Sequence, residues 1–306
     1  MITTICLNPA FDKTVKVDEL RTAEVNRILH VREDLGGKGI NVAAVAHRLG
    51  LEAQCFGCMG EDGSAKLNEK MAEIGVSYDF MTLPGNIRTN LKVVSSKDQT
   101  VTELNEQGCP MNGDQLNEFM RRMSCKTMGS YAVLTGSLPP GCPEDTYRRI
   151  IETLRDVPAI LDAEGNNLLL GLEAGPYLVK PNLSELESTL GTSLRTLRAI
   201  RDASYVLLKK GAKSVIVSMG KMGALFTDKS RTLYAPALSV KALSTVGAGD
   251  AMVGGILLGL ENGESLESAF RYGMAAGAAS VMTEGTQPIC LEDFQKLLPK
   301  VVVQEV

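Results

Sequence analysis

The sequence predicts an α/β protein in which strand–helix units surround a mainly parallel β-sheet. Short apolar runs rich in β-branched residues alternate with stretches of helical periodicity as far as residue 218. Two polar segments of alternating pattern interrupt this rhythm, as expected for a small second sheet with one solvated face. The 306 residues, 44% of them hydrophobic, suffice for the core of one large domain spanning 1–306.

The elements follow one another along the chain in the order that this fold requires. The expected strands of the main sheet are short and apolar, at 3–7, 53–57, 131–135, 159–162, 177–179 and 214–218. The expected helices between them lie at 40–50, 64–75, 113–123, 144–154 and 194–209. Beyond residue 218, glycine-rich turns predict antiparallel edge strands at 224–227 and 231–235, followed by helices at 248–260, 266–282 and 291–298.

The two interrupting segments are 13–32 and 88–107. Apolar and polar residues alternate in both, as at Val15 and Val17 in the first and Leu91 and Val93 in the second. We expect them to form one small sheet, joined to the main domain by two crossings. Such a sheet has exposed edges and one apolar face, so either the main domain or a second subunit must cover it.

The overall charge indicates a small-molecule partner. The formal net charge of −4 and the pI near 5.5 argue against binding to nucleic acid or to an anionic membrane, both of which require a clustered positive field. The N-terminal residues do not resemble a secretory signal, and the apolar stretch 251–260 is too short to span a bilayer. We therefore expect a cytoplasmic location.

The seven cysteines, an odd number spread along the chain, do not resemble a disulfide framework, so reduced thiols are expected. Cys55 and Cys58 have the spacing of a redox or zinc half-site. No second pair lies at a suitable distance, and both histidines precede them. The preferred interpretation is two small apolar residues at the end of a strand.

The segment 244–250 carries the strongest catalytic signal. Small residues at Gly247, Ala248 and Gly249 leave the backbone N–H groups at the start of the next helix unobstructed, which suits a phosphoryl group. Asp250 follows directly, and a carboxylate beside a phosphate is unfavourable unless it serves the reaction, for example by accepting a hydroxyl proton. The alternative is a glycine-rich turn capped by Asp250. The segment alone favours neither.

A second glycine-rich turn precedes the helix expected near residue 40. Gly37 would allow a ligand to approach the backbone closely, while Lys38 and Asn41 supply a charge and a bidentate hydrogen-bonding group. The alternative is an ordinary strand-to-helix turn. The sequence contains neither a P-loop nor a Gly-x-Gly-x-x-Gly turn after the first strand, so a phosphate must be held in another way.

Polar residues also follow several of the other expected strands. Asp12 lies at the ligand-binding end of the sheet and is suited to bind vicinal hydroxyls, although a turn-forming role is commoner for such an aspartate. Ser137 lies in a loop whose hydroxyl and amides would hold a second anion. Asn182 and Glu185, three residues apart, would point both side-chain oxygens toward one metal hydration shell.

Together these motifs resemble the ribokinase-like (PfkB) carbohydrate kinase family. The early stretch 36–43 and the late stretch 244–255 match the family's two diagnostic motifs in order and separation, and the resemblance covers essentially the whole chain. It implies a doubly wound sheet flanked by helices, with a β-sheet lid formed by about 12–35 and 87–108. It also implies ATP and Mg²⁺, a monovalent cation such as K⁺, and in-line transfer of the γ-phosphoryl group to a sugar hydroxyl.

The resemblance assigns roles to individual residues. Asp250 becomes the base, the amides of Gly247, Ala248 and Gly249 form the anion hole, and Asn182 and Glu185 act on the metal through water. The contacts that it assigns to the nucleotide fall after three strands and in the late motif: Lys180, Asn182, Glu185, Ser218, Gly220, Gly223, Thr245, Gly247 and Gly249.

Within the family, the chain looks like the branch that phosphorylates sugar phosphates, which comprises 1-phosphofructokinases, tagatose-6-phosphate kinases and the minor 6-phosphofructokinase. That likeness implies conversion of a ketohexose monophosphate to the bisphosphate, with fructose 1-phosphate ahead of tagatose 6-phosphate. The acceptor contacts that it implies are Asp12, Gly37, Lys38, Asn41, Arg88, Asn90, Ser137 and Arg27. We expect a homodimer through the lid, in which Arg27 reaches either the site of its own subunit or, as in the family pattern, that of the partner.

Two other classes of function compete with a kinase. A nicotinamide-dependent oxidoreductase would need a phosphate-binding turn where residues 7–12 stand, and an inert sugar-phosphate sensor would have lost the base that Asp250 supplies. One departure from the family pattern concerns residues 162–165, where relatives often have Asp-x-Ser-Gly. Any substrate or nucleotide role for Asp162 is therefore in doubt.

Overall fold

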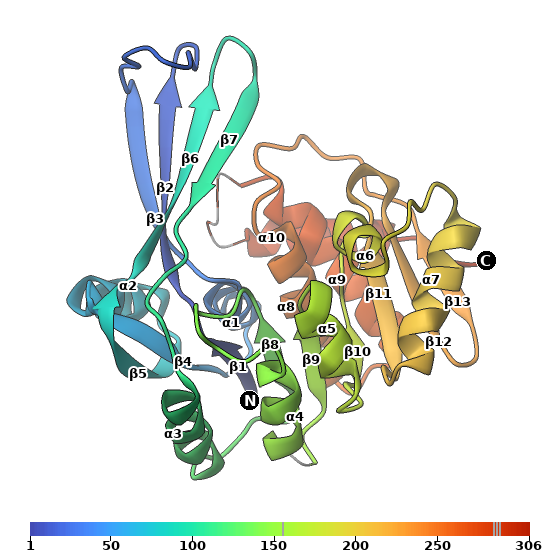
Figure 1. Ribbon diagram of the computed structural model, residues 1–306. Coiled ribbons are helices and arrows are strands. Elements are labelled where there is room, and N and C mark those ends of the chain that lie inside the picture. The colour runs from blue at the N-terminus through green and yellow to red at the C-terminus, as the bar shows by residue number, and fades with distance from the viewer. Residues whose placement is uncertain (155, 284, 286, 288) are drawn as a thin grey trace.

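A computed structural model describes the chain from residue 1 to residue 306, apart from residues 155, 284, 286 and 288 (Figure 1). In this part of the chain the strands form a ten-stranded sheet and a four-stranded sheet. From one edge to the other, the large sheet runs β14 (Gln304–Glu305), β13 (Thr232–Ala235), β12 (Ala224–Asp228), β11 (Ser214–Ser218), β10 (Leu178–Val179), β9 (Ala159–Asp162), β8 (Ala132–Thr135), β1 (Ile2–Cys6), β4 (Ala53–Asp62) and β5 (Ser77–Asn86).

The large sheet is parallel from β5 to β11 and antiparallel from there to β14. Its chain order reverses at β1, with β4 and β5 on one side and β8 to β11 on the other. Ligands of open α/β sheets bind beyond the carboxyl ends of the strands near such a reversal. The predicted doubly wound, mainly parallel sheet is therefore confirmed.

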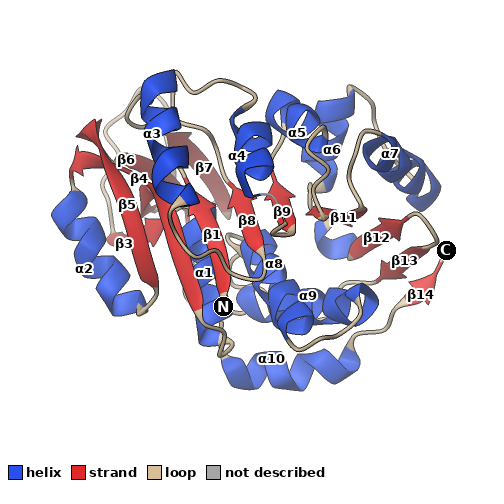
Figure 2. Ribbon diagram, turned by 90° about the horizontal axis from the view of Figure 1, so that it is seen from below, coloured by secondary structure: helices blue, strands red, loops and turns tan. Residues whose placement is uncertain are grey.

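Helices cover both faces of the large sheet. Figure 2 shows α3 to α7 along one side and α8, α9 and α10 along the other. Their bounds are α1 (Lys38–Arg48), α2 (Ser64–Ile74), α3 (Gly113–Ser124), α4 (Thr146–Leu154), α5 (Gly165–Leu172), α6 (Leu183–Leu190), α7 (Leu197–Lys209), α8 (Ala248–Glu261), α9 (Leu266–Ser280) and α10 (Leu291–Leu297), with 3₁₀ turns η1 (Gly220–Met222) and η2 (Leu298–Lys300).

Two cores result, one on each side of the sheet, because neighbouring strand residues point to opposite faces. In β1, Ile2 packs with α1, α8 and α9, whereas Ile5 packs with α3 and α4. Helix α3 illustrates the local signals: Asn112 and Gln115 form a capping box at its start, and its apolar residues at 116, 119 and 123 face the second core.

The structure contains four elements that the sequence did not predict: β5, α5, α6 and β14. Strand β5 includes Pro84 and Gly85, which weaken a strand signal but are tolerated because β5 is an edge strand. Helices α5 and α6 have eight residues each, too few for a clear helical period. The first strand after α1 is also longer than expected and extends to Asp62, and Cys55 and Cys58 are buried within it as apolar side chains.

The small sheet has the order β3 (His30–Gly36), β2 (Ala10–Val17), β6 (Arg88–Ser95) and β7 (Thr100–Asn105). It projects from the rest of the molecule in Figure 1. Asp12 pairs with Asn90 and Val15 with Val93, so the alternation predicted from the sequence gives the sheet one polar and one apolar face. No helix among the described residues is long and apolar enough to cross a membrane.

Candidate active site

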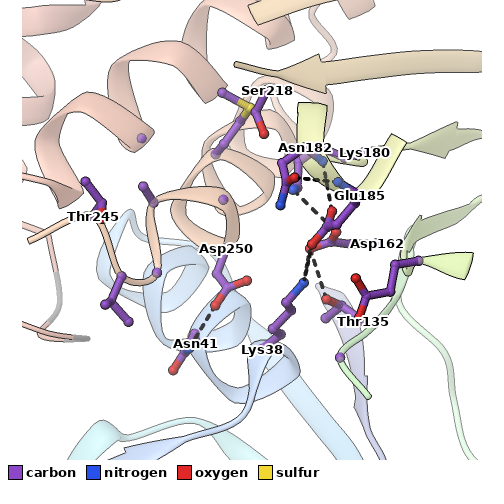
Figure 3. A pocket seen from close by; sticks show the side chains of 18 of the residues that line it. Lys38, Asn41, Thr135, Asp162, Lys180, Asn182, Glu185, Ser218, Thr245 and Asp250 are labelled. Carbon is purple, nitrogen blue, oxygen red and sulfur yellow. Dashed lines mark hydrogen bonds and ion pairs between the residues drawn. The ribbon is translucent and has the colours of Figure 1, made fainter. Parts of the chain in front are cut away.

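A cavity of about 1400 Å³ lies where the carboxyl ends of the large-sheet strands, the small sheet and the start of α8 meet. All the site residues predicted from the sequence line it except Arg27, which lies exposed between β2 and β3. Figure 3 shows side chains from the early motif, the strand ends and the late motif converging on this space. The residues predicted to act together are thus brought together by the fold.

Helix α8 presents its N-terminus to the cavity. Gly247 caps it in a left-handed conformation, with φ of 78°, which a glycine adopts without strain. A side chain at Gly249 would come within 3.2 Å of Lys180 Nζ, so a buried ammonium group lies directly beside this turn. The free N–H groups of a first helical turn together with an ammonium group make a site for an anion.

Asp250 lies in the first turn of α8 and is buried. The side-chain amide of Asn41, from the first turn of α1, donates a 2.8 Å hydrogen bond to Asp250 Oδ2. Burial raises the pKa of Asp250 to about 6, and the nearby ammonium of Lys38 limits the rise. A carboxyl group with this pKa is ionised at neutral pH and remains a useful proton acceptor.

Asp162, whose role the sequence left in doubt, occupies the centre of the cavity wall. Lys180 Nζ lies 3.4 Å from its Oδ1, Lys38 Nζ lies 3.7 Å from its Oδ2, and the Thr135 hydroxyl donates a 3.2 Å hydrogen bond to Oδ2. Burial alone would raise the pKa of Asp162, but the two ammonium groups hold it below its usual value. Asp162 in turn is the main reason that the pKa of Lys38 is raised.

Asn182 and Glu185 form a capping box at the start of α6. Asn182 Oδ1 accepts the Glu185 N–H, and Glu185 Oε2 accepts the Asn182 N–H, each at 2.8 Å. Glu185 Oε1 faces Lys38 Nζ at 3.5 Å. The helix cap engages one lone pair of the Asn182 oxygen, and the water-mediated metal role of the pair stays a prediction.

The side-chain oxygens of Asn182 and Glu185 suit Mg²⁺ only if water molecules lie between the ion and the protein. Among the residues described, no three His, Cys, Asp or Glu side chains are grouped to hold a metal. Glu185 Oε1 is the oxygen of the pair that the helix cap leaves for such a contact. Mg²⁺ usually keeps several waters and binds through one or two carboxylates together with substrate phosphates, so the residues present suit an ion carried mainly by a nucleotide.

The small sheet contributes its polar face to the cavity. Asn90 Nδ2 donates to Asp12 Oδ1 at 2.8 Å, and Lys92 Nζ lies 3.2 Å from Asp12 Oδ2. Gly36 leaves room for this carboxylate, since a side chain there would come within 2.6 Å of it. Asn90 Oδ1 is buried without a hydrogen-bond partner in the described chain and so can accept from a ligand hydroxyl.

Lys92 was not recognised from the sequence, although a signal was available. Residues 90 and 92 alternate with the apolar Leu91 and Val93, so both belong to the face that carries Asp12. The strand pattern that predicted Asn90 therefore also indicated Lys92.

Arg88 lies at the junction between the two sheets. Its guanidinium donates to the backbone carbonyls of Asn8 and Glu106, and it makes no ion pair with the described residues. The Asn8 amide also donates to the Ser137 hydroxyl, at 3.2 Å, which brings the loop after β8 to the same place. Burial lowers the pKa of Arg88, as expected for a cation without a carboxylate partner.

The opposite end of the cavity is largely apolar. Gly223 has a φ of +90°, and a side chain there would collide with the Ala235 carbonyl, so glycine is required to close η1 against β13. Ser218, Gly220 and Thr245 line this end beside apolar side chains that the sequence analysis did not identify: Leu238, Val240, Met252, Met274 and Val281. The first two lie in an irregular segment, where periodicity gives no signal.

Comparison with known proteins agrees with this geometry. A family model described as pfkB family carbohydrate kinase matches residues 6–293. A 1-phosphofructokinase of Bacillus subtilis (strain 168) is 33% identical over 307 residues, covering 99% of each chain. A 1-phosphofructokinase of Escherichia coli (strain K12) is 34% identical over 284 residues, covering 92% of this chain and 90% of the relative. The solved structure of Escherichia coli phosphofructokinase-2 in complex with potassium has a TM-score of 0.90 at 30% identity and covers 98% of each chain. The chain therefore belongs to the pfkB family of carbohydrate kinases.

Proposed function

We propose that the protein transfers the γ-phosphoryl group of ATP to a ketohexose monophosphate, with fructose 1-phosphate as the preferred acceptor, and so acts as a 1-phosphofructokinase. The observation that carries the proposal is the position of Asp250, a buried carboxylate with a pKa of about 6 at the start of α8. It lines a cavity that has both a polar, cation-containing part and an apolar part. The names of the two curated relatives support the choice of acceptor.

In the proposed reaction, an acceptor hydroxyl oxygen attacks the γ-phosphorus as its proton passes to Asp250. The bond from the γ-phosphorus to the β,γ-bridging oxygen breaks, and ADP leaves with that electron pair. Asn41 holds the carboxylate in place through its 2.8 Å hydrogen bond. Removing the hydroxyl proton during attack, rather than before it, is the role for which a pKa near the working pH is suited.

Two groups of donors would stabilise the charge in transit. The N-terminal turn of α8, from Gly247 to Gly249, would face the transferring group, and Lys180 lies beside Gly249. Lys38, from α1, extends toward the same carboxylate as Lys180, that of Asp162. Mg²⁺, bound with ATP and reached from Glu185 through water, would neutralise phosphate charge, and K⁺ would support the same anion site.

The acceptor would lie along the small sheet. Asp12 and Asn90 are placed to accept and donate hydrogen bonds to the sugar hydroxyls. Arg88 supplies a cation that no described carboxylate neutralises, and Ser137 supplies a neutral donor, so together they suit the phosphate that the acceptor already carries. Adenosine would occupy the apolar half, near Ser218, Gly220, Gly223 and Thr245.

We further propose that the segments 12–35 and 87–108 act as a lid and as the contact between two subunits. The face of the small sheet opposite the cavity carries Val31 and Leu104, which are 48% and 59% exposed, next to the buried Val15 and Val93. Covering an exposed apolar face is a common cause of dimer formation. In such a dimer Arg27 would reach the partner's cavity. A cytoplasmic location is part of the same proposal.

The acceptor can be tested by initial-rate assays with fructose 1-phosphate, tagatose 6-phosphate and fructose 6-phosphate, coupled to ADP formation. We expect the highest kcat/KM for fructose 1-phosphate. A preference for tagatose 6-phosphate would favour the second candidate of the same branch. A preference for an unphosphorylated sugar would contradict the assignment of Arg88 and the branch together.

A further inference from the structure

Asp162 is the buried carboxylate at the centre of the cavity wall, and no step of the proposed reaction uses it directly. Its side chain is 1% exposed, and it is surrounded by two ammonium groups and one hydroxyl, from Lys38, Lys180 and Thr135. These partners come from α1, from the segment after β10 and from β8. One carboxylate at the end of β9 thus contacts side chains from three different elements.

The two lysines differ in how much they depend on this carboxylate. The Lys180 side chain is 4% exposed, and Asp162 is the ion-pair partner that the described chain gives it. The Lys38 side chain is 41% exposed and is shared between Asp162 and Glu185. A buried ammonium group without a counter-ion is strongly destabilising, so Lys180 can lie beside the α8 turn only because Asp162 is there.

We infer that Asp162 is a positioning residue, whose buried carboxylate holds the ammonium groups of Lys38 and Lys180 beside the path that the phosphoryl group takes. The inference rests on the proposed function, since that path is defined by Asp250 and the α8 turn. Asp162 Oδ2 faces Lys38 and the Thr135 hydroxyl, and Oδ1 lies within ion-pair distance of Lys180 although it accepts no hydrogen bond from the described residues, so we assign Asp162 a role that acts through the two lysines.

The same arrangement connects Asp162 to the base. The groups that face Asp250 are Lys38 and Asn41 from α1, Lys180 after β10 and Asp162 itself. The negative charge of Asp162 raises the pKa of Asp250, while the two ammonium groups lower it. Removing only the charge of Asp162 should therefore move the titration of Asp250 to lower pH, an effect that a purely structural role would not produce.

The test is the pH dependence of kcat/KM in Asp162→Asn and Asp162→Glu. Asp162→Asn should lower kcat/KM about 100-fold, as expected when catalytic groups lose their alignment. It should also shift the acid limb of the kcat/KM profile to a lower pH than in the wild type. Asp162→Glu keeps the negative charge, so the acid limb of its kcat/KM profile should stay near the wild-type pH even where misplacement of the lysines lowers the rate. Asp79→Asn, which breaks the exposed ion pair with Lys126, serves as the control with an unchanged limb.

A second measurement separates this inference from the proposed function. Urea unfolding is measured without substrates. It compares the stability of proteins with and without Asp250→Asn, first in the wild-type background and then in the Asp162→Asn background. In each background, the pH at which the two stability curves diverge reports the titration of Asp250. Coincident titrations in the two backgrounds would overturn the inference whatever the acceptor is. Failure of the wild type to use fructose 1-phosphate would contradict only the proposed function. If Asp162→Asn does not fold, Lys180→Met should move the acid limb to higher pH, and an unmoved limb overturns the inference.

Discussion

Replacing Asp250 with Asn should make the protein both inactive and more stable. The amide is isosteric and can still accept the hydrogen bond from Asn41, but it cannot take a proton from the acceptor. Loss of a general base lowers turnover about 10²- to 10⁴-fold, equivalent to roughly 3–5 kcal/mol of barrier. Binding of ATP should change little, because Asp250 faces the acceptor hydroxyl in the proposed reaction.

The gain in stability follows from the pKa of Asp250. Its folded value of about 6 lies above the ordinary 3.8, so the protonated form stabilises the native state. That contribution is fully present below about pH 4 and is lost as the pH rises through about 6. At neutral pH the charged carboxylate costs at most roughly 3 kcal/mol, which Asp250→Asn should recover.

The assay combines initial rates with urea unfolding at several pH values. The two proteins should have parallel stability curves below about pH 4 and should diverge, with Asp250→Asn the more stable, as the pH rises through about 6. Asp228→Asn is the control, since hydrogen bonds lower the pKa of Asp228 outside the cavity. It should be fully active and no more stable than the wild type. Wild-type turnover by Asp250→Asn, or stability curves that remain parallel through pH 6, would refute the role given to this carboxylate.

Three further predictions concern the base, the acceptor phosphate and the small sheet. The kcat/KM of the wild type should fall tenfold per pH unit below about 6, as Asp250 becomes protonated; a limb well away from that value would point to another base. Arg88→Met should raise the KM for the phosphorylated acceptor about 10- to 100-fold, because a charge-assisted contact to phosphate is lost, while the KM for ATP stays constant. Arg121→Met, on the exposed face of α3, should change neither KM. Equal effects of Arg88→Met and Arg121→Met would contradict the assignment of Arg88 to the acceptor phosphate. Leu104→Glu should raise the dimer dissociation constant about 100-fold in sedimentation experiments, whereas Val206→Glu on α7 should not; a monomeric wild type would remove the proposed contact.

The main sheet could be predicted because its strands are short apolar runs separated by clear helical periods. The segment 244–250, to which we assign the catalytic role, was also visible, since a glycine-rich turn before an apolar helix is a local pattern. Its partner was not: Asn41 is 209 positions away from Asp250, and a single sequence does not define that distance in space. The same applies to Asp162, whose meaning depends on lysines from two other elements.

The site proposed for the phosphoryl donor, ATP, was predicted only in part. The capping box that occupies Asn182 depends on the helix starting at Leu183, and α6 is too short to be recognised by its period. The apolar residues around the nucleotide end come partly from a segment without regular structure. Local sequence patterns therefore predicted the charged part of the cavity better than its apolar part.

The two-faced small sheet makes the protein unusually sensitive to changes in chain length. In β2 and β6, even-numbered positions such as Asp12 and Lys92 face the cavity, whereas odd-numbered positions such as Val15 and Val93 face away from it. In the proposed arrangement, point substitutions can therefore alter sugar recognition and subunit contact independently of each other. Insertion or deletion of one residue within either strand would exchange the two faces, putting carboxylates on the face proposed for subunit contact and valines on the face proposed for the sugar. We expect natural variation in these strands to consist of substitutions, with changes in length confined to the loops at their far ends.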